Sequence, residues 1–180
     1  MQTTAAFFPP PSGVPSETVA ASSASATQSA RATATPTGGA TTRPTPAALV
    51  NTTGRNLALN RPAWASGSEG AAWVPANAVD GVADSRWSSA FADPQWLKVD
   101  LGTRWQISKI VVRWERAYGT AYRVEVSTDD KTWKSVFSTA RGQGGDVIIS
   151  TTGVTARFVR LYGTHRSSEY GYSVYELEVR

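Results

Sequence analysis

Cysteine is absent from the sequence, so the chain can form neither a disulfide framework nor a thiolate metal site. Histidine occurs only once, as His165, which excludes a metal site built on two histidines. No G-x-S-x-G nucleophile elbow accompanies His165, and this argues against a hydrolase triad. No run of about 18 consecutive apolar residues occurs either, so the sequence predicts no membrane-spanning helix.

Large aromatic residues are scarce in the first 54 residues, where only Phe7 and Phe8 occur. All seven Trp and all six Tyr lie at or after Trp64, while Ala, Thr, Ser and Pro dominate the earlier stretch. Such a stretch cannot bury enough apolar surface to offset the entropy lost on ordering. We therefore expect a disordered linker over residues 1–54 and one folded domain over residues 55–180.

Positive charge is not concentrated anywhere in the chain. The formal net charge is +4 and the isoelectric point is about 9.6, but basic residues such as Arg86, Lys98, Arg113 and Arg141 are scattered. A nucleic-acid interface requires a basic patch. We therefore expect no nucleic-acid partner.

Short apolar runs with a period of two alternate with turn residues from residue 56 onward. For example, Tyr122, Val124 and Val126 alternate with Arg123 and Glu125, which predicts a strand with one buried and one wet face. We find no helical period, so the pattern predicts an all-β domain of two packed sheets. The expected strands are 95–101, 107–115, 122–127, 132–138, 146–150, 156–162 and 174–180.

Eight short segments occur in an order that carries a resemblance to a known family. They are 56–58 (NLA), 77–81 (NAVDG), 86–89 (RWSS), 93–96 (DPQW), 99–102 (VDLG), 122–127 (YRVEVS), 156–164 (ARFVRLYGT) and 170–173 (YGYS). With them the chain resembles the discoidin, or coagulation factor V/VIII type C, domains, and among these the family 32 carbohydrate-binding modules. The resemblance implies a jelly-roll β-sandwich of the galactose-binding-domain-like type, with its ligand site on loops at one end.

The same resemblance implies a function, a location and a partner. It implies a non-catalytic module that targets a secreted glycoside hydrolase or surface protein to a polysaccharide, such as a glucan, chitosan or a galactoside. A tethered catalytic domain and an extracellular location follow from it, and we expect a monomer. The opening residues MQTTAAFFPPPSG lack the basic and apolar regions of a signal peptide, so we expect either a fragment of a longer secreted protein or another export route.

A sugar site needs an aromatic face to stack on the ring and planar polar groups to bond its hydroxyls. By the resemblance, Glu115 and Tyr170 are the first candidates for these two roles. The other candidates are Tyr118, Tyr172, Arg166, Glu69, Trp73 and Arg86. Three of these residues also allow a purely structural role. Tyr172 could be a core aromatic, Arg166 could pair with Glu169 at the surface, and Trp73 could pack beneath its own loop.

One position departs from the relatives. Many of them carry an acidic residue directly after the Trp-Ser-Ser element, where this chain has Ala90. A module that grips a polycation is expected to keep that carboxylate. Ala90 therefore favours a neutral glucan over chitosan.

Residues 77–85 are rich in the oxygen ligands that calcium prefers. Relatives often place a structural Ca²⁺ here, closed by a Glu from the final strand. The implied ligands are Ala78, Asp80, Asp84, Ser85 and Glu176. The alternative is that Asp80 only caps its own turn by accepting backbone N–H bonds.

Two other function classes fit the sequence less well. Glu115 and Glu169 could in principle form a glycosidase pair, but a small sandwich has little material for a deep, water-excluding cleft; we expect no enzyme. A discoidin domain that binds membrane phospholipid or a protein receptor is the alternative function. Animal members of that kind tie their termini with a disulfide and project apolar spikes, and here Cys is absent and the loops carry Ser, Gly, Glu and Tyr.

Overall fold

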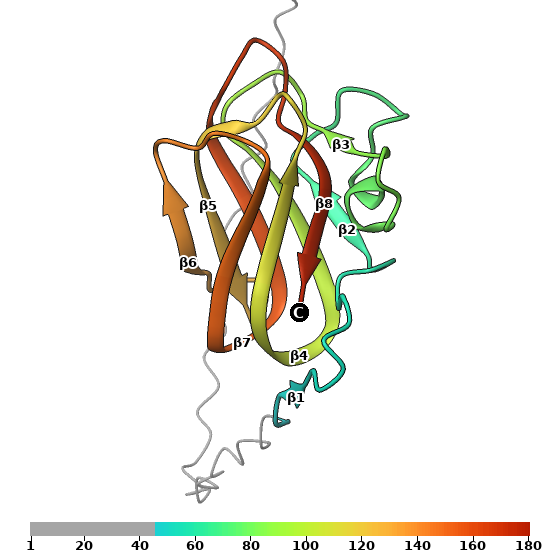
Figure 1. The fold of residues 1–180 in the computed structure, drawn as a ribbon, viewed down its shortest axis with the longest axis vertical. Helices are drawn as coiled ribbons and strands as arrows, with labels where there is room; N and C mark the ends of the chain where they lie inside the picture. The colour runs from blue at the N-terminus through green and yellow to red at the C-terminus, as the bar shows by residue number, and fades with distance from the viewer. Residues whose placement is uncertain (1–45) are drawn as a thin grey trace, which may run out of the picture. The chain divides into compact units, whose positions relative to one another are not determined.

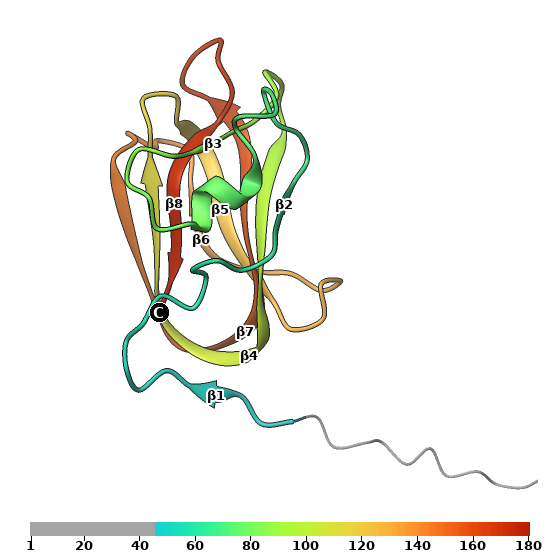
Figure 2. The same ribbon diagram turned by 90° about the vertical axis from the view of Figure 1, so that its right-hand side faces the viewer.

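The structure is a computed structural model that describes residues 46–180. It contains eight strands and one short 3-10 helix, shown in Figure 1. They are β1 (Leu49–Val50), β2 (Ala63–Ala65), η1 (Pro75–Val79), β3 (Trp87–Ser88), β4 (Gln95–Trp114), β5 (Gly119–Ser127), β6 (Lys134–Thr139), β7 (Asp146–Arg166) and β8 (Ser173–Val179). The expected all-β sandwich is confirmed, with η1 beside β8 (Figure 2).

Two long strands, β4 and β7, run through both layers of the sandwich. They pair antiparallel from Gln95 opposite Gly163 to Arg113 opposite Asp146. The first half of β4 also pairs with β2, and its second half pairs with β8. The strand order is β3-β8-β4-β7-β5-β6.

Each of these long strands was predicted as two separate strands, which was wrong. Residues 95–101 and 107–114 belong to β4, with Glu115 just beyond its end, and residues 146–150 and 156–162 belong to β7. The strands bend at register shifts instead of ending, and Gly102, with φ of +84°, lies in the first shift of β4. Glycine adopts this conformation without steric cost. Gly102, which would usually indicate a turn, therefore allows the strand to bend and pass from one layer to the other.

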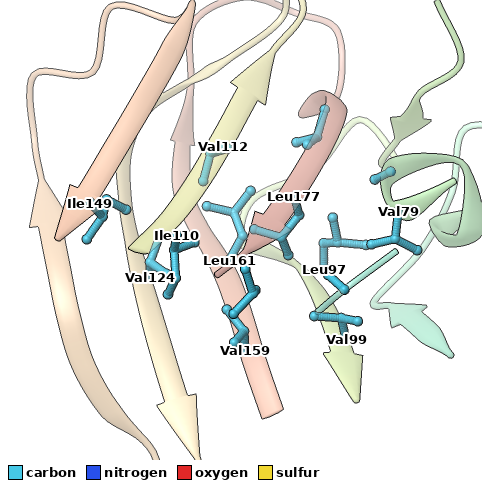
Figure 3. Packing of buried hydrophobic residues seen from close by; sticks show 14 of the residues in the cluster. Val79, Leu97, Val99, Ile110, Val112, Val124, Ile149, Val159, Leu161 and Leu177 are labelled. Atoms are coloured by element: carbon cyan, nitrogen blue, oxygen red, sulfur yellow. The ribbon is translucent and has the colours of Figure 1, made fainter. Parts of the chain in front are cut away.

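The core fills the space between the two layers. Figure 3 shows Leu97, Val99, Ile110, Leu161 and Leu177 pointing into it from β4, β7 and β8. All of them are at most 2% exposed. The period of two thus marks the inner face correctly.

The outer face of β5 is drier than the alternation predicts. Glu125, expected on the wet face, is 6% exposed. Its carboxylate pairs with Arg123 (2.5 Å) and with Arg160 (2.6 Å), and the Arg160 guanidinium lies 4.1 Å from the centre of the Trp133 ring. A buried carboxylate requires such partners, and here guanidinium groups and an aromatic ring cover it.

The loops at one end of the sandwich lie together. The strand pairs Arg113–Asp146, Gly119–Arg166, Tyr122–Thr139 and Gln95–Gly163 are all at this end. We call it the tip; its loops are 66–74, 89–94, 115–118, 140–145 and 167–172, and most are at the top of Figures 1 and 2.

Chain entry and exit lie away from the tip. The Leu57 amide donates to the Val179 carbonyl (2.7 Å), and Arg180 Nη1 donates to the Gly54 carbonyl (2.9 Å). Strand β1 lies inside the stretch expected to be linker and pairs in parallel with Trp105 and Gln106 of β4. Structured chain therefore begins before residue 55, and the rest of the linker prediction, residues 1–45, lies outside the described residues. Over residues 46–180, no helix has the length and apolar character needed to cross a bilayer.

Candidate functional site

A hollow of about 470 Å³ lies at the tip, and we call it the tip hollow. Four connecting segments and the ends of β3 and β8 form it. Its lining residues are Glu69, Arg86, Ser88, Glu115, Arg116, Ala117, Ser168, Tyr170 and Ser173. The structure thus brings together four of the residues that the sequence analysis singled out, Glu69, Arg86, Glu115 and Tyr170, from segments up to a hundred residues apart.

Glu115 directly follows β4 and is held by its own loop. Its amide donates to the Ser173 carbonyl (2.9 Å), and its Oε2 accepts the Ala117 amide (3.1 Å). Within the described residues no hydrogen bond reaches Oε1. The loop therefore orients the carboxylate while leaving one oxygen for a ligand.

Tyr170 is 57% exposed, and its loop is pinned from below. Arg166 Nη1 donates to the carbonyls of Glu169 (2.8 Å) and Tyr170 (3.3 Å), and Arg166 Nε lies 3.3 Å from Asp93 Oδ2. Arg166 does not line the tip hollow, and it bonds the backbone of Glu169 instead of its carboxylate. Arg166 therefore stabilises the conformation of the Tyr170 loop.

Phe91 lies next to Tyr170 and was not among the residues predicted for the site. Phe91 is 50% exposed, and its ring meets the Tyr170 ring edge to face at 6.0 Å. Edge-to-face packing is a preferred arrangement of aromatic pairs. Phe91 directly follows Ala90, the position at which the chain departs from its relatives, and this could have indicated a role at the site.

Two of the residues that line the tip hollow have buried polar atoms without hydrogen-bond partners in the described part of the chain. Arg86 lies 3.9 Å from the centre of the Trp73 ring, and Arg86 Nε is buried without a hydrogen bond within the described residues. Ser173 Oγ is likewise buried and unpaired, and Ser173 is 2% exposed. A buried unpaired polar group costs roughly 1–3 kcal/mol. Ser173 was not among the expected site residues, since nothing in its sequence context marks it.

Trp73 and Tyr118 do not line the tip hollow. Trp73 supports the guanidinium of Arg86, so it acts on the hollow through a neighbour. Tyr118 is half-buried against the core and lines a different hollow on the other side of Glu115.

The expectation that Tyr172 contacts a ligand is corrected by its burial. Tyr172 is 1% exposed, with its ring 6.4 Å from that of Trp114. Its hydroxyl donates to Asp93, and its amide donates to Ser89 Oγ (2.8 Å). Burial, and then the hydrogen bond to the Asp93 carboxylate, raise the pKa of Tyr172. Tyr172 ties the loop of Phe91 to the loop of Tyr170 and offers no ring face to a sugar.

The candidate calcium ligands lie away from the tip hollow, around Glu176 of β8. Glu176 Oε1 accepts the Gly81 amide (2.7 Å), and its Oε2 is buried without a partner within the described residues. Burial, with repulsion from Asp80, raises the pKa of Glu176 to about 7.

Asp80 caps its own turn, as the alternative interpretation expected, because its Oδ1 accepts the Val82 amide (2.9 Å). Ser85 Oγ lies 2.8 Å from the same oxygen and 3.1 Å from the Asn77 carbonyl. Ala78 is fully buried and can offer only its carbonyl, whereas Asp84 is exposed. No group of three or more His, Cys, Asp or Glu suited to a metal occurs in residues 46–180. Glu176 Oε2 has no partner in the described residues, and the segment that Glu176 bonds at Gly81 supplies Asp80 and Ser85, so the donor set is of the oxygen type that a hard cation takes.

Several solved structures similar to this chain are carbohydrate-binding modules. Chitosan-binding module 1 from a chitosanase/glucanase of Paenibacillus sp. IK-5 is 42% identical, with a TM-score of 0.68, covering 70% of this chain and 98% of the module. Module 2 of that enzyme, in complex with chitotriose, is 43% identical, with a TM-score of 0.67, covering 69% and 98%. The family 32 module of Clostridium perfringens NanJ, in complex with galactose, is 20% identical with a TM-score of 0.57 over 67% of this chain and 93% of that one; it shows the fold alone.

Two further comparisons concern sequence. The Polysaccharide lyase 8 family protein HylA of Enterococcus faecalis is 38% identical over 91 residues, which are 49% of this chain and 7% of the lyase. The chain thus spans only a small part of that relative. The model of the F5/8 type C domain matches residues 62–177. With this match over most of its length, the chain belongs to the F5/8 type C domain family.

Proposed function

We propose that the folded domain is a non-catalytic carbohydrate-binding module that holds a polysaccharide in the tip hollow. The observation that carries this proposal is that exposed Tyr170 and Glu115, whose carboxylate has one oxygen without a hydrogen bond in the described residues, line the same hollow. A sugar ring needs both an apolar face and paired hydrogen-bonding groups, and the hollow offers them side by side. The chitosan-binding modules at 42–44% identity support the same assignment.

The sugar that we propose is a gluco-configured chain, glucan or chitosan. Arg86 and Arg116 balance the charges of Glu69 and Glu115 around the hollow. Because the adjoining loop has Ala90 and Phe91 instead of a further acid, a neutral glucan fits this balance better than a polycation.

Binding without chemistry follows from the shape of the site. The ring of Tyr170 stands in solvent at the mouth of the hollow, so water is not excluded there as catalysis requires. The proposed role is to raise the concentration of a tethered catalytic domain on a polysaccharide outside the cell.

We further propose that a structural Ca²⁺ binds at Glu176, with Asp80, Ser85 and the carbonyl of Ala78. The ion would neutralise the buried carboxylate and hold residues 77–85 against β8. Asp84 is left out because its side chain is exposed. The ion would not act on the sugar, since none of these residues lines the tip hollow.

Membrane phospholipid is the less favoured ligand. The expectation that the tip lacks apolar spikes was wrong at Phe91, which is 50% exposed. However, the adjacent hollow is lined by two carboxylates, Glu69 and Glu115, and two guanidinium groups, Arg86 and Arg116, so it has no excess of positive charge to attract anionic headgroups.

Replacing Tyr170 with alanine is expected to weaken polysaccharide binding at least about tenfold, since the ring supplies the stacking face. Glu115→Gln should also weaken polysaccharide binding. Titration calorimetry against chitosan, cellulose-type and laminarin-type oligosaccharides, galactosides and phosphatidylserine vesicles measures this and names the ligand.

Matched variants separate this result from a general surface effect. Glu169→Gln changes a carboxylate on the Tyr170 loop that does not line the hollow, and Trp64→Ala removes a 47% exposed ring on β2. Both should bind like the wild type. Equal sugar affinity in all five proteins, or binding to vesicles alone, would contradict the proposed function.

A further inference from the structure

A second hollow of about 300 Å³ lies at the tip, and we call it the flank hollow. Its lining residues are Trp114, Glu115, Arg116, Tyr118, Gln143, Gly144, Gly145 and Tyr175. Glu115 and Arg116 line both hollows, so this pair forms a ridge with one hollow on each side.

The flank hollow is built by contact between two loops. The Trp114 amide donates to the Gly145 carbonyl (3.0 Å), which holds the 140–145 loop against the end of β4. Gly144 has φ of +73°, and a Cβ there would come within 2.7 Å of Tyr118 Cδ1. Glycine at this position therefore lets the backbone pack directly on the edge of the Tyr118 ring.

The chemistry of the flank hollow repeats that of the tip hollow. Tyr118 and Tyr175 supply half-buried rings, and Gln143 supplies an exposed planar amide. Glu115 and Arg116 supply the charged groups that hydroxyls bond in pairs. Within the described residues, no hydrogen bond occupies the Gln143 amide or the hydroxyls of Tyr118 and Tyr175.

We infer that the flank hollow is a second sugar subsite, so that one polysaccharide chain crosses the Glu115–Arg116 ridge and occupies both hollows. The inference rests on the proposed function and extends it to the length of the ligand. A ligand that reaches both hollows gains contacts that a monosaccharide cannot make. The domain therefore prefers long chains over single sugars, and Glu115 contacts two successive parts of the chain.

A chain-length series tests this inference. Affinities for glucan and chitosan oligosaccharides, from one sugar unit to six, are measured for the wild type, Gln143→Ala and Tyr175→Phe. Both variants should keep the wild-type affinity for the shortest ligands that bind. Each should lose roughly three- to tenfold for the longest, the size of a lost hydrogen bond.

Gln106→Ala is the matched control, because Gln106 is exposed on β4 where that strand pairs with β1, away from the tip. Amide chemical shifts of Gly144 and Gly145 give a second measurement, and they should move with long ligands and stay still with short ones. A gain with chain length that all variants retain, with unmoved Gly144 and Gly145, would overturn the subsite and leave the tip hollow intact. A wild type that binds no sugar would overturn both proposals.

Discussion

Alanine in place of Tyr172 is expected to lower the free energy of unfolding by roughly 3–5 kcal/mol, as for other large buried aromatics. The ring is 1% exposed and packs beside Trp114, so its removal leaves a cavity where several strand ends meet. The same substitution also deletes the hydroxyl that bonds Asp93, whose carboxylate then loses a donor. Urea denaturation followed by tryptophan fluorescence measures the change.

Tyr170→Ala is the matched comparison, since it makes the same chemical change two residues earlier in the chain. Its ring is 57% exposed, so the free energy of unfolding should change by no more than about 0.5 kcal/mol while sugar binding falls. If Tyr172→Ala does not fold, Tyr172→Phe still reports on the hydroxyl alone and should cost roughly 1.5–3 kcal/mol, the range for bonds to charged groups. Equal stability of the Tyr170 and Tyr172 variants would show that the two roles have been exchanged or misassigned.

Glu176 is expected to make the metal-free domain less stable as the pH rises. Its pKa is about 7 in the folded state against 4.5 for the free side chain, so the folded state holds the proton over this interval while the unfolded chain releases it. Stability is therefore fully present below about pH 4.5 and is lost as the pH passes about 7, by at most about 3 kcal/mol. Denaturation in the presence of a chelator across this range measures it, and Glu176→Gln should flatten the profile.

Calcium should remove this loss, because a cation beside Glu176 stabilises the charged carboxylate. At pH 8, a hundredfold excess over the dissociation constant is expected to stabilise the fold by about 2.7 kcal/mol, seen as a higher melting temperature. At pH 5 the effect should be small, since Glu176 is then largely protonated. Asp84→Asn should keep the calcium response and Glu176→Gln should lose it. A melting temperature that neither chelator nor calcium moves at pH 8 would exclude the ion.

The residues on the inner face of the sandwich could be predicted from the sequence, whereas the burial of residues on its outer face could not. Tyr122, Val124 and Val126 alternate as they are buried, because side chains on a strand point to opposite faces. Glu125 shares that alternation yet is buried as well, since Arg160 of β7 pairs with its carboxylate and the ring of Trp133, just before β6, packs on the Arg160 guanidinium. Periodicity predicts which side chains of one strand share a face, but it does not predict which residues of neighbouring segments will cover them.

The candidate site also contains some residues that the sequence predicts and others that only the packing reveals. Glu115 and Tyr170 were marked by residue type and by resemblance, and both line one hollow. Tyr172 has the same side chain as Tyr170 but takes the opposite role, because its ring meets Trp114 from a distant strand. Ser173 became visible only through its unpaired hydroxyl, which depends on the packing around it.

The two ends of the folded domain are clipped together by the bonds from Leu57 to Val179 and from Arg180 to Gly54. A pull on either end would therefore enter the sandwich at nearly the same point, away from the tip. The load would pass through β8 and the long strands before it reached the tip loops. The tip, which we propose holds the polysaccharide, thus has neither chain connection beside it to obstruct its approach to a large substrate.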